Sequence, residues 1–299
     1  MKSLTKGYVL GAVAAVSYGT NPLFAVPLYD AGLSVGSVLF YRYIIATLLL
    51  GLVMVYRHAS FSVTRRQAML LVAEGILFGL SSVGLFEAYR YMDVGIASTM
   101  LFVEPVMIAL LLWVFWRERI SVRAVVSIAV SLVGVAFLCN PGEGANVSAL
   151  GVVLVMASAL SYGLYMILIN KTSLQRLSGL TLTFWSLLFG NLVMIAKVGF
   201  FTQLQPIPAD MLSVACALGL SVFPTIVSIL TVAVAVRIIG SVAVSILGAL
   251  EPVTGVAVGV LVFGEVMTLR VAAGCVLILV AVTVLVTGKR RSQPEASAD

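Results

Sequence analysis

The chain has 299 residues, of which 61% are hydrophobic and only 10% are charged, and its mean hydropathy is +1.15. A water-soluble protein could not bury so much apolar surface, so the composition excludes that class. The net charge of +6 is scattered over many connecting segments and therefore does not indicate a nucleic-acid-binding surface.

Ten apolar segments are long enough to cross a bilayer, which takes roughly 20 residues in a helix. In chain order we predict spans over 7–27, 34–55, 67–91, 95–116, 122–139, 150–169, 180–200, 211–236, 240–263 and 270–287. The first span follows two lysines, as a signal peptide would, but it is too long for one and is kept as a helix. The connections are short, and we expect residues 289–299 to form a disordered tail.

The sequence is also duplicated. Pairs 147 positions apart are Arg90/Arg237, Ser98/Ser245, Glu104/Glu251, Pro105/Pro252, Val106/Val253, Glu118/Glu265 and Arg123/Arg270. Pairs 144 positions apart include Gly7/Gly151, Ser17/Ser161, Tyr18/Tyr162, Gly19/Gly163 and Phe40/Phe184. We predict two repeats of five spans, over 1–145 and 146–288. Because five is odd, the second repeat would be inverted in the membrane, as in many secondary transporters.

The basic residues predict the orientation of these spans. Most Lys and Arg residues lie in the segments on the same side as the amino terminus, whereas Arg90, Lys197 and Arg270 lie near the other face. Since Lys and Arg accumulate on the cytoplasmic side, both termini are predicted to be cytoplasmic. The expected fold is therefore an all-α integral membrane protein of ten helices, arranged as a five-plus-five inverted repeat around a central cavity.

Two Glu-Pro pairs lie in the middle of the fourth and ninth predicted spans. Proline removes a helical hydrogen bond, and a carboxylate at this depth is costly and points to function by default. Because both repeats keep the pair, we favour a structural or hinge role over a coupling role. The predicted hinge set is Pro22, Glu104, Pro105, Pro224, Glu251 and Pro252.

Two other glutamates occur in one repeat only. Glu74 lies in the third span without a basic neighbour, its counterpart is Ser221, and it is our candidate for proton coupling. The alternative is a structural role. Glu87 lies near the outer surface, three residues before Arg90, and is predicted to form an interfacial ion pair with it.

Arg42 lies roughly 12 Å inside the outer face of the second span. Glu104 enters from the same face to a similar depth, so a buried Arg42–Glu104 ion pair is one prediction. The alternative is that the Arg42 side chain extends outward to the membrane surface.

A polar and helix-weakening run, Ser17-Tyr18-Gly19-Thr20-Asn21-Pro22, interrupts the first span, and the sixth span repeats its first three residues. Irregular backbone at membrane depth is tolerated where it is buried in protein or lines a cavity. Close helix packing through small residues is the alternative. The predicted substrate-binding set is Ser17, Tyr18, Asn21, Thr99, Phe102, Ser161, Tyr162, Tyr165, Thr225 and Ser245.

The motifs of soluble enzymes fail on inspection. Residues 32–36 match G-x-S-x-G, but the single histidine, His58, is predicted on the opposite side of the membrane. The chain has no phosphate-binding glycine loop. Cys139, Cys216 and Cys275 lie in apolar segments without metal-ligand spacing. We therefore expect no enzyme activity, no metal site and no cofactor.

The duplicated five spans, with Glu-Pro in spans four and nine followed by Glu118 and Glu265, resemble the EamA branch of the drug/metabolite transporter superfamily. Within it, the chain is most similar to bacterial aromatic amino acid and methyl viologen exporters. The resemblance covers about residues 7–287 and implies a ten-helix inverted repeat whose cavity opens to one side at a time. Small four-helix members of the superfamily exchange protons through a glutamate in their first span, but spans 7–27 and 150–169 contain no acidic residue.

We therefore expect a transporter in the bacterial inner membrane that exports amino acids or similar amphipathic metabolites by alternating access. Its expected partners are a small-molecule substrate and membrane lipid, with no nucleic acid, and it is expected to be monomeric. Two alternatives are an integral-membrane enzyme that modifies lipid and a non-transporting scaffold or sensor. The missing catalytic residues disfavour the first, and the duplicated helix-breaking residues disfavour the second.

Overall fold

The computed structural model describes residues 2–88, 91, 100–138, 148–264 and 267–288, and every regular element in those ranges is a helix. The first half contains α1 (Lys2–Gly19), α2 (Asn21–Asp30), α3 (Val35–Tyr56), α4 (Arg65–Ala88), α6 (Glu104–Trp116) and α7 (Val122–Leu138). The second half begins with α8 (Ala149–Lys171), η1 (Ser173–Arg176), α9 (Gly179–Lys197), α10 (Met211–Ser221) and the π-helical turn η2 (Val222–Val227). It ends with α11 (Ser228–Ile239), α12 (Ser241–Leu247), α13 (Leu250–Val262) and α14 (Leu269–Gly288).

Seven helical segments in the described ranges are long and apolar enough to cross a membrane. They are Leu4–Asp30, Val35–Tyr56, Arg65–Ala88, Ala149–Lys171, Gly179–Lys197, Met211–Ile239 and Ser241–Val262. Three shorter apolar helices, Glu104–Trp116, Val122–Phe137 and Leu269–Leu285, occupy the positions predicted for spans four, five and ten. The surface of the bundle carries many exposed apolar side chains, among them Leu52, Trp113 and Phe115. Such a surface is suited to lipid and not to water.

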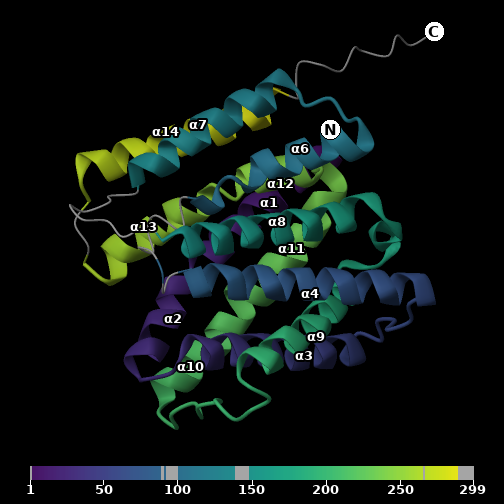
Figure 1. Ribbon diagram of the computed structural model, residues 1–299, viewed down its shortest axis with the longest axis vertical. Coiled ribbons are helices and arrows are strands. Elements are labelled where there is room, and N and C mark those ends of the chain that lie inside the picture. The colour runs from purple at the N-terminus through teal and green to yellow at the C-terminus, as the bar shows by residue number, and fades with distance from the viewer. Residues whose placement is uncertain (1, 89–90, 92–99, 139–147, 265–266, 289–299) are drawn as a thin grey trace.

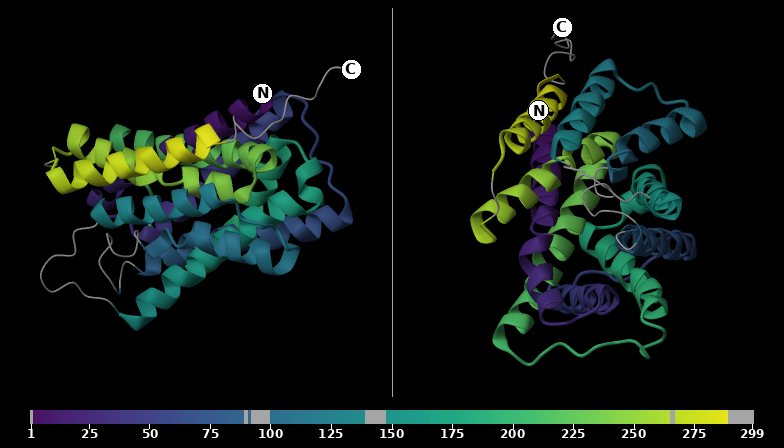
Figure 2. Two further views of the ribbon diagram at one scale, coloured as in Figure 1. Left: turned by 90° about the horizontal axis from the view of Figure 1, so that it is seen from above. Right: turned by 60° about the vertical axis from the view of Figure 1, so that its left-hand side comes forward.

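The helix pairs that pack together recur when the two halves are exchanged. α1 packs on α11, and their repeat counterparts α8 and α4 pack on each other. α3 packs on α10, as α9 packs on α4. Helices in equivalent positions of the two halves also pair, since α7 lies beside α14 (Figure 1) and α3 beside α9. In the turned views α14 stays at an edge of the bundle (Figure 2).

Glycine permits a close contact between α4 and α9. A Cβ added to Gly75 on α4 would lie 2.8 Å from the backbone oxygen of Ser186 on α9 and 2.7 Å from the Cβ of Phe189. These distances are shorter than van der Waals contact, so any side chain at Gly75 would push α4 and α9 apart. The absence of a side chain at Gly75 therefore allows α4 and α9 to pack closely.

Candidate functional site

Two cavities lie toward opposite ends of the long helices. The first, which we name the Arg42 cavity, has a volume of about 480 Å³ and is lined by α2, the end of α1, the start of α3 and the first turn of α13. The second, the Arg123 cavity, has a volume of about 590 Å³ and is lined by the ends of α6, α8 and α11 and the start of α7. Tyr18 on α1 lines the first cavity and Tyr8 lines the second. Tyr8 and Tyr18 are ten residues apart on α1, which corresponds to about 15 Å along the helix axis.

A much smaller cavity, of about 40 Å³, separates these two. On α1 its lining residues Gly11, Ala14 and Ala15 fall between Tyr8 and Tyr18. The rest of its wall includes Glu104, Pro105, Tyr162, Ser245 and Glu251. We name this wall the central layer, because along α1 it lies between the residues that line the two large cavities.

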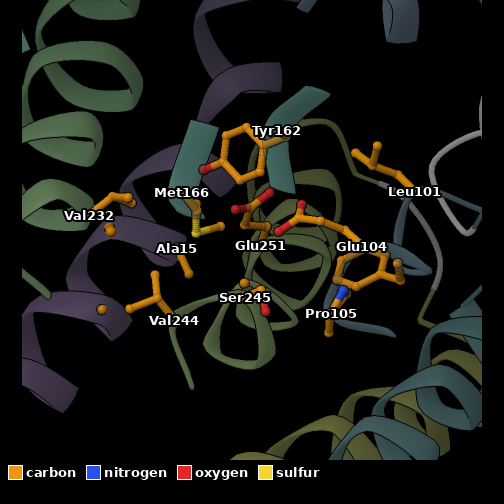
Figure 3. Close-up of a pocket in the computed structure, with 14 residues that line it drawn as sticks. Ala15, Leu101, Glu104, Pro105, Tyr162, Met166, Val232, Val244, Ser245 and Glu251 are labelled. Carbon is orange, nitrogen blue, oxygen red and sulfur yellow. The ribbon is translucent and has the colours of Figure 1, made fainter. Parts of the chain in front are cut away.

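Two carboxylates meet in the central layer. Those of Glu104 and Glu251 point toward one another, close to the ring of Tyr162 (Figure 3), and the charges of the two groups interact. Oε1 of Glu104 is buried and has no hydrogen-bond partner among the described residues. Like charges at close range in a poorly solvated site repel, so the approach of the two carboxylates is costly.

Helix interruptions supply the polar backbone of the site. α1 ends at Gly19 and α2 starts at Asn21, with Pro22 in its first turn. α12 ends at Leu247 and α13 starts at Leu250, which places Glu251 and Pro252 in the first turn of α13. Glu104 and Pro105 likewise open α6. Proline is well accommodated there because the first turn of a helix lacks internal acceptors for its N–H groups.

The Arg42 side chain is held at the break between α1 and α2 and at the π-helical turn η2. Its Nε donates to Oγ1 of Thr225 at 2.7 Å, Nη1 to Oδ1 of Asn21 at 3.2 Å, and Nη2 to the carbonyl oxygen of Pro224 at 3.1 Å. The guanidinium carbon also lies 5.1 Å from the centre of the Tyr18 ring, within the range of a cation–π interaction. The site thus joins α1, α2, α3 and η2 through one cation.

Both sequence predictions for Arg42 were wrong. It forms no ion pair with Glu104, since its hydrogen bonds go to Thr225, Asn21 and Pro224. It does not extend outward either, because only 3% of the residue is exposed. The physical reason is local, since the break before α2 and the π-helical turn η2 offer uncharged acceptors to the guanidinium. Depth in the membrane, on which the predictions rested, does not specify direction around a helix axis.

The remaining glutamates have different surroundings. Glu74 is fully buried and accepts a hydrogen bond from Oγ of Ser186 at 2.7 Å, while its Oε2 has no hydrogen-bond partner among the described residues. Glu87 forms an ion pair with Lys197 on α9, and Arg90, its predicted partner, lies outside the described residues. Glu118 forms an ion pair with Lys171, and both line the Arg123 cavity.

The predicted site residues fall into three groups. Those that line the Arg42 cavity are Tyr18, Asn21, Pro22, Phe102, Glu251 and Pro252. Those that line the small central cavity are Phe102, Glu104, Pro105, Tyr162, Ser245 and Glu251. Those that line neither cavity are Ser17, Glu74, Ser161, Tyr165, Pro224 and Thr225. Oγ of Ser17 donates to the carbonyl oxygen of Phe223, and Pro224 and Thr225 accept hydrogen bonds from Arg42. Glu74 lies on α4, Ser161 is partly buried on α8, and the buried Tyr165 packs on Phe78. Thr99 lies outside the described residues.

Sequence reasoning did not place Arg42 in the cavity wall, nor Tyr29, which lines the cavity too. A guanidinium within a membrane span is costly, and this cost indicates a ligand-binding role for Arg42 as well as an ion pair with a carboxylate. In the described part of the chain, no three His, Cys, Asp or Glu side chains come together as a metal site.

Comparisons with known proteins agree with this architecture. A sequence model described as "EamA-like transporter family" matches residues 5–140 and 149–287. "Uncharacterized transporter YvbV" of Bacillus subtilis (strain 168) is 27% identical over 216 residues, which are 68% of this chain and 66% of that protein. "Uncharacterized transporter YxxF" of the same organism is 25% identical over 67% of this chain and 62% of its own length. The chain thus spans just under two thirds of these relatives. A solved crystal structure that is 18% identical has the same fold, with a TM-score of 0.78 over 95% of this chain and 99% of that one.

Proposed function

The chain belongs to the EamA-like transporter family, and from that premise we propose that it exports amino acids or similar small amphipathic metabolites across the bacterial inner membrane. It is a multi-pass membrane protein. The mechanism we propose is alternating access, in which a substrate site near the centre of the membrane faces one side at a time.

The observation that carries this proposal is the arrangement of the cavities. Two spaces large enough for a small organic molecule lie toward opposite ends of the helices, and the central layer separates them. The layer is built where α6 and α13 begin and where α12 ends, so small rotations at these interruptions could open one side and close the other. This is the hinge role that the two Glu-Pro pairs have in the proposal.

The packing supports an inverted repeat of ten spans, with halves at 1–145 and 146–288. Helix contacts such as α1–α11 recur as α8–α4 when the halves are exchanged, as a two-fold axis between them requires. Five spans in each half would place that axis in the membrane plane. The orientation with both termini in the cytoplasm is supported by Arg119, Arg123 and Lys171, which cluster at the Arg123 cavity.

The chemistry of the Arg42 cavity supports an amphipathic substrate. Aromatic and aliphatic side chains form most of its wall, with Tyr29, Phe86 and Phe102 among them, while Asn21, Arg42 and Glu251 supply the polar contacts. A mainly apolar pocket with a few fixed polar groups is typical of small-molecule sites. The exporter subgroup that the sequence resembles is the reason to test aromatic and aliphatic amino acids first.

Flux measurements in liposomes test the proposal. We expect the purified full-length protein to accelerate the movement of labelled phenylalanine or leucine across the bilayer. Ala25→Trp, which fills the Arg42 cavity, should abolish this flux, whereas Leu48→Trp, at a position 61% exposed on the outer surface of α3, should retain it. Absence of flux with every amino acid and amphipathic metabolite tested would refute the proposed substrate class. Chemical change of added lipid without flux would favour the enzyme alternative.

A further inference from the structure

Arg42 carries a charge but forms no direct ion pair within the described part of the chain. It lies on α3 in the wall of the Arg42 cavity, with 3% of the residue exposed. The described ion pairs, Glu118–Lys171 and Glu87–Lys197, do not include it. A buried cation without an anionic partner is costly, and within a membrane such a residue marks a functional site by default.

The three hydrogen bonds of Arg42 leave two of its N–H donors unused. A guanidinium has five N–H groups. Thr225, Asn21 and Pro224 each accept from one of them, on Nε, Nη1 and Nη2 respectively. One N–H remains on each terminal nitrogen, without a hydrogen-bond acceptor among the described residues. Free N–H groups on a fixed guanidinium are suited to bind the oxygens of a carboxylate.

The surroundings restrict the anion that could bind there. Arg42 and Glu251 are the only charged side chains among the described residues that line this cavity. The two lie near enough for their charges to interact. A multiply charged anion such as a phosphate would be opposed by Glu251 and attracted by a single arginine. A molecule with one carboxylate and one ammonium group would satisfy both charges at once.

We propose that Arg42 recognises the carboxylate of the transported molecule, and that this molecule is a zwitterion whose ammonium group faces Glu251 and whose apolar body packs on Phe86 and Phe102. The inference rests on the proposed transport function and assigns its specificity to two residues. Thr225, Asn21 and Pro224 act as positioning groups, since they hold the guanidinium while its free edge faces the ligand. This role explains why the cation is buried beside uncharged acceptors.

Three probe molecules with the same phenyl group distinguish the contribution of the carboxylate from that of the ammonium group. L-phenylalanine carries both, L-phenylalaninamide lacks the carboxylate, and 3-phenylpropionate lacks the ammonium group. Binding is read as protection of an Ala25→Cys variant, at a cavity-lining position on α2, from a water-soluble maleimide. The labelling of the three native cysteines in the parent chain is subtracted. Loss of a hydrogen bond to a charged group corresponds to on the order of a tenfold weaker interaction or more.

We expect phenylalanine to protect at concentrations at least ~10-fold lower than either analogue. In the same background, Arg42→Gln should remove the preference for phenylalanine over the amide and keep its preference over 3-phenylpropionate. Glu251→Gln should do the reverse. A purely structural role of Arg42 would weaken all three probes alike, and that result would overturn the inference.

The order in which the three probes protect the Ala25→Cys variant with Arg42 and Glu251 intact tests the inference even if Arg42→Gln fails to fold. Equal protection by phenylalanine and its amide, or protection by none of the three, would overturn it. Flux of amino acids in liposomes is measured separately. Flux with equal protection by the amide would leave the proposed function standing and remove only the role of Arg42. Protection by phenylalanine without flux would refute transport and retain the binding site.

Discussion

Replacement of Thr225 by valine probes the contact that holds Arg42 in place. The Thr225 side chain is fully buried, accepts from Nε of Arg42 at 2.7 Å and donates to the carbonyl oxygen of Leu220 at 2.8 Å. Valine keeps the shape and loses both hydrogen bonds. A hydrogen bond to a charged group contributes about 1.5–3 kcal/mol in soluble proteins, whereas side-chain hydrogen bonds within membranes average about 0.6 kcal/mol. Between these limits, we expect Thr225→Val to lower the free energy of unfolding by about 2 kcal/mol.

Thermal unfolding of the purified protein in detergent measures this loss. One kcal/mol corresponds to about 2–4 °C in proteins of 150–250 residues, so we expect the apparent Tm to fall by roughly 4–8 °C. The matched control is Thr231→Val, because the Thr231 hydroxyl donates only to backbone carbonyls one turn back in the same span. In the double variant with Arg42→Met, the loss should be less than additive, since the partner of Thr225 is already gone. Equal shifts for Thr225→Val and Thr231→Val, or strict additivity with Arg42→Met, would refute the reasoning.

Three further predictions follow from other contacts. Gly75→Ala should lower the free energy of unfolding by about 1–3 kcal/mol because its Cβ would lie 2.8 Å from a backbone oxygen of α9, whereas Gly255→Ala, with open space around it, should be neutral or stabilising in the same thermal assay. Glu104→Gln should leave the Tm at pH 7 unchanged or raise it, because it removes one of two facing carboxylates, and a fall as large as that of Glu104→Ala would contradict this. Hydrogen bonds from Ser213 hold the pKa of Asp210 below its ordinary value. The stability that Asp210 contributes is therefore present above the pKa of the unfolded state and is lost as the pH falls through the pKa of the folded state. The Tm difference between wild type and Asp210→Ala should shrink from pH 7 to pH 3.

The sequence was sufficient to predict the fold class and the family. Helices in a membrane must satisfy their backbone hydrogen bonds internally, so the long apolar segments 34–55 and 150–169 already predict helical spans. The EamA-like family was inferred from the spacing of Glu104-Pro105 and Glu251-Pro252, and the family comparison confirms it. Pro22, Pro105 and Pro252 also marked places where helices begin anew, since proline weakens a helix interior but is accommodated in the first turn.

The partners of the buried charges could not be obtained in this way. Hydropathy gives the depth of a residue, but the direction of its side chain depends on how its helix is rotated and on which neighbours approach it. Arg42 and Glu104 lie at similar predicted depths, yet Arg42 contacts Thr225 and Asn21, while Glu104 faces Glu251. The glutamates at 104 and 251 are 147 positions apart in the chain and share one small cavity only because α6 and α13 begin beside each other. The sequence by itself determined that the chain folds into long apolar helices, seven of which in the described residues are long enough to cross a membrane. The tertiary packing alone decided which charges meet, because those contacts join residues that no local pattern connects.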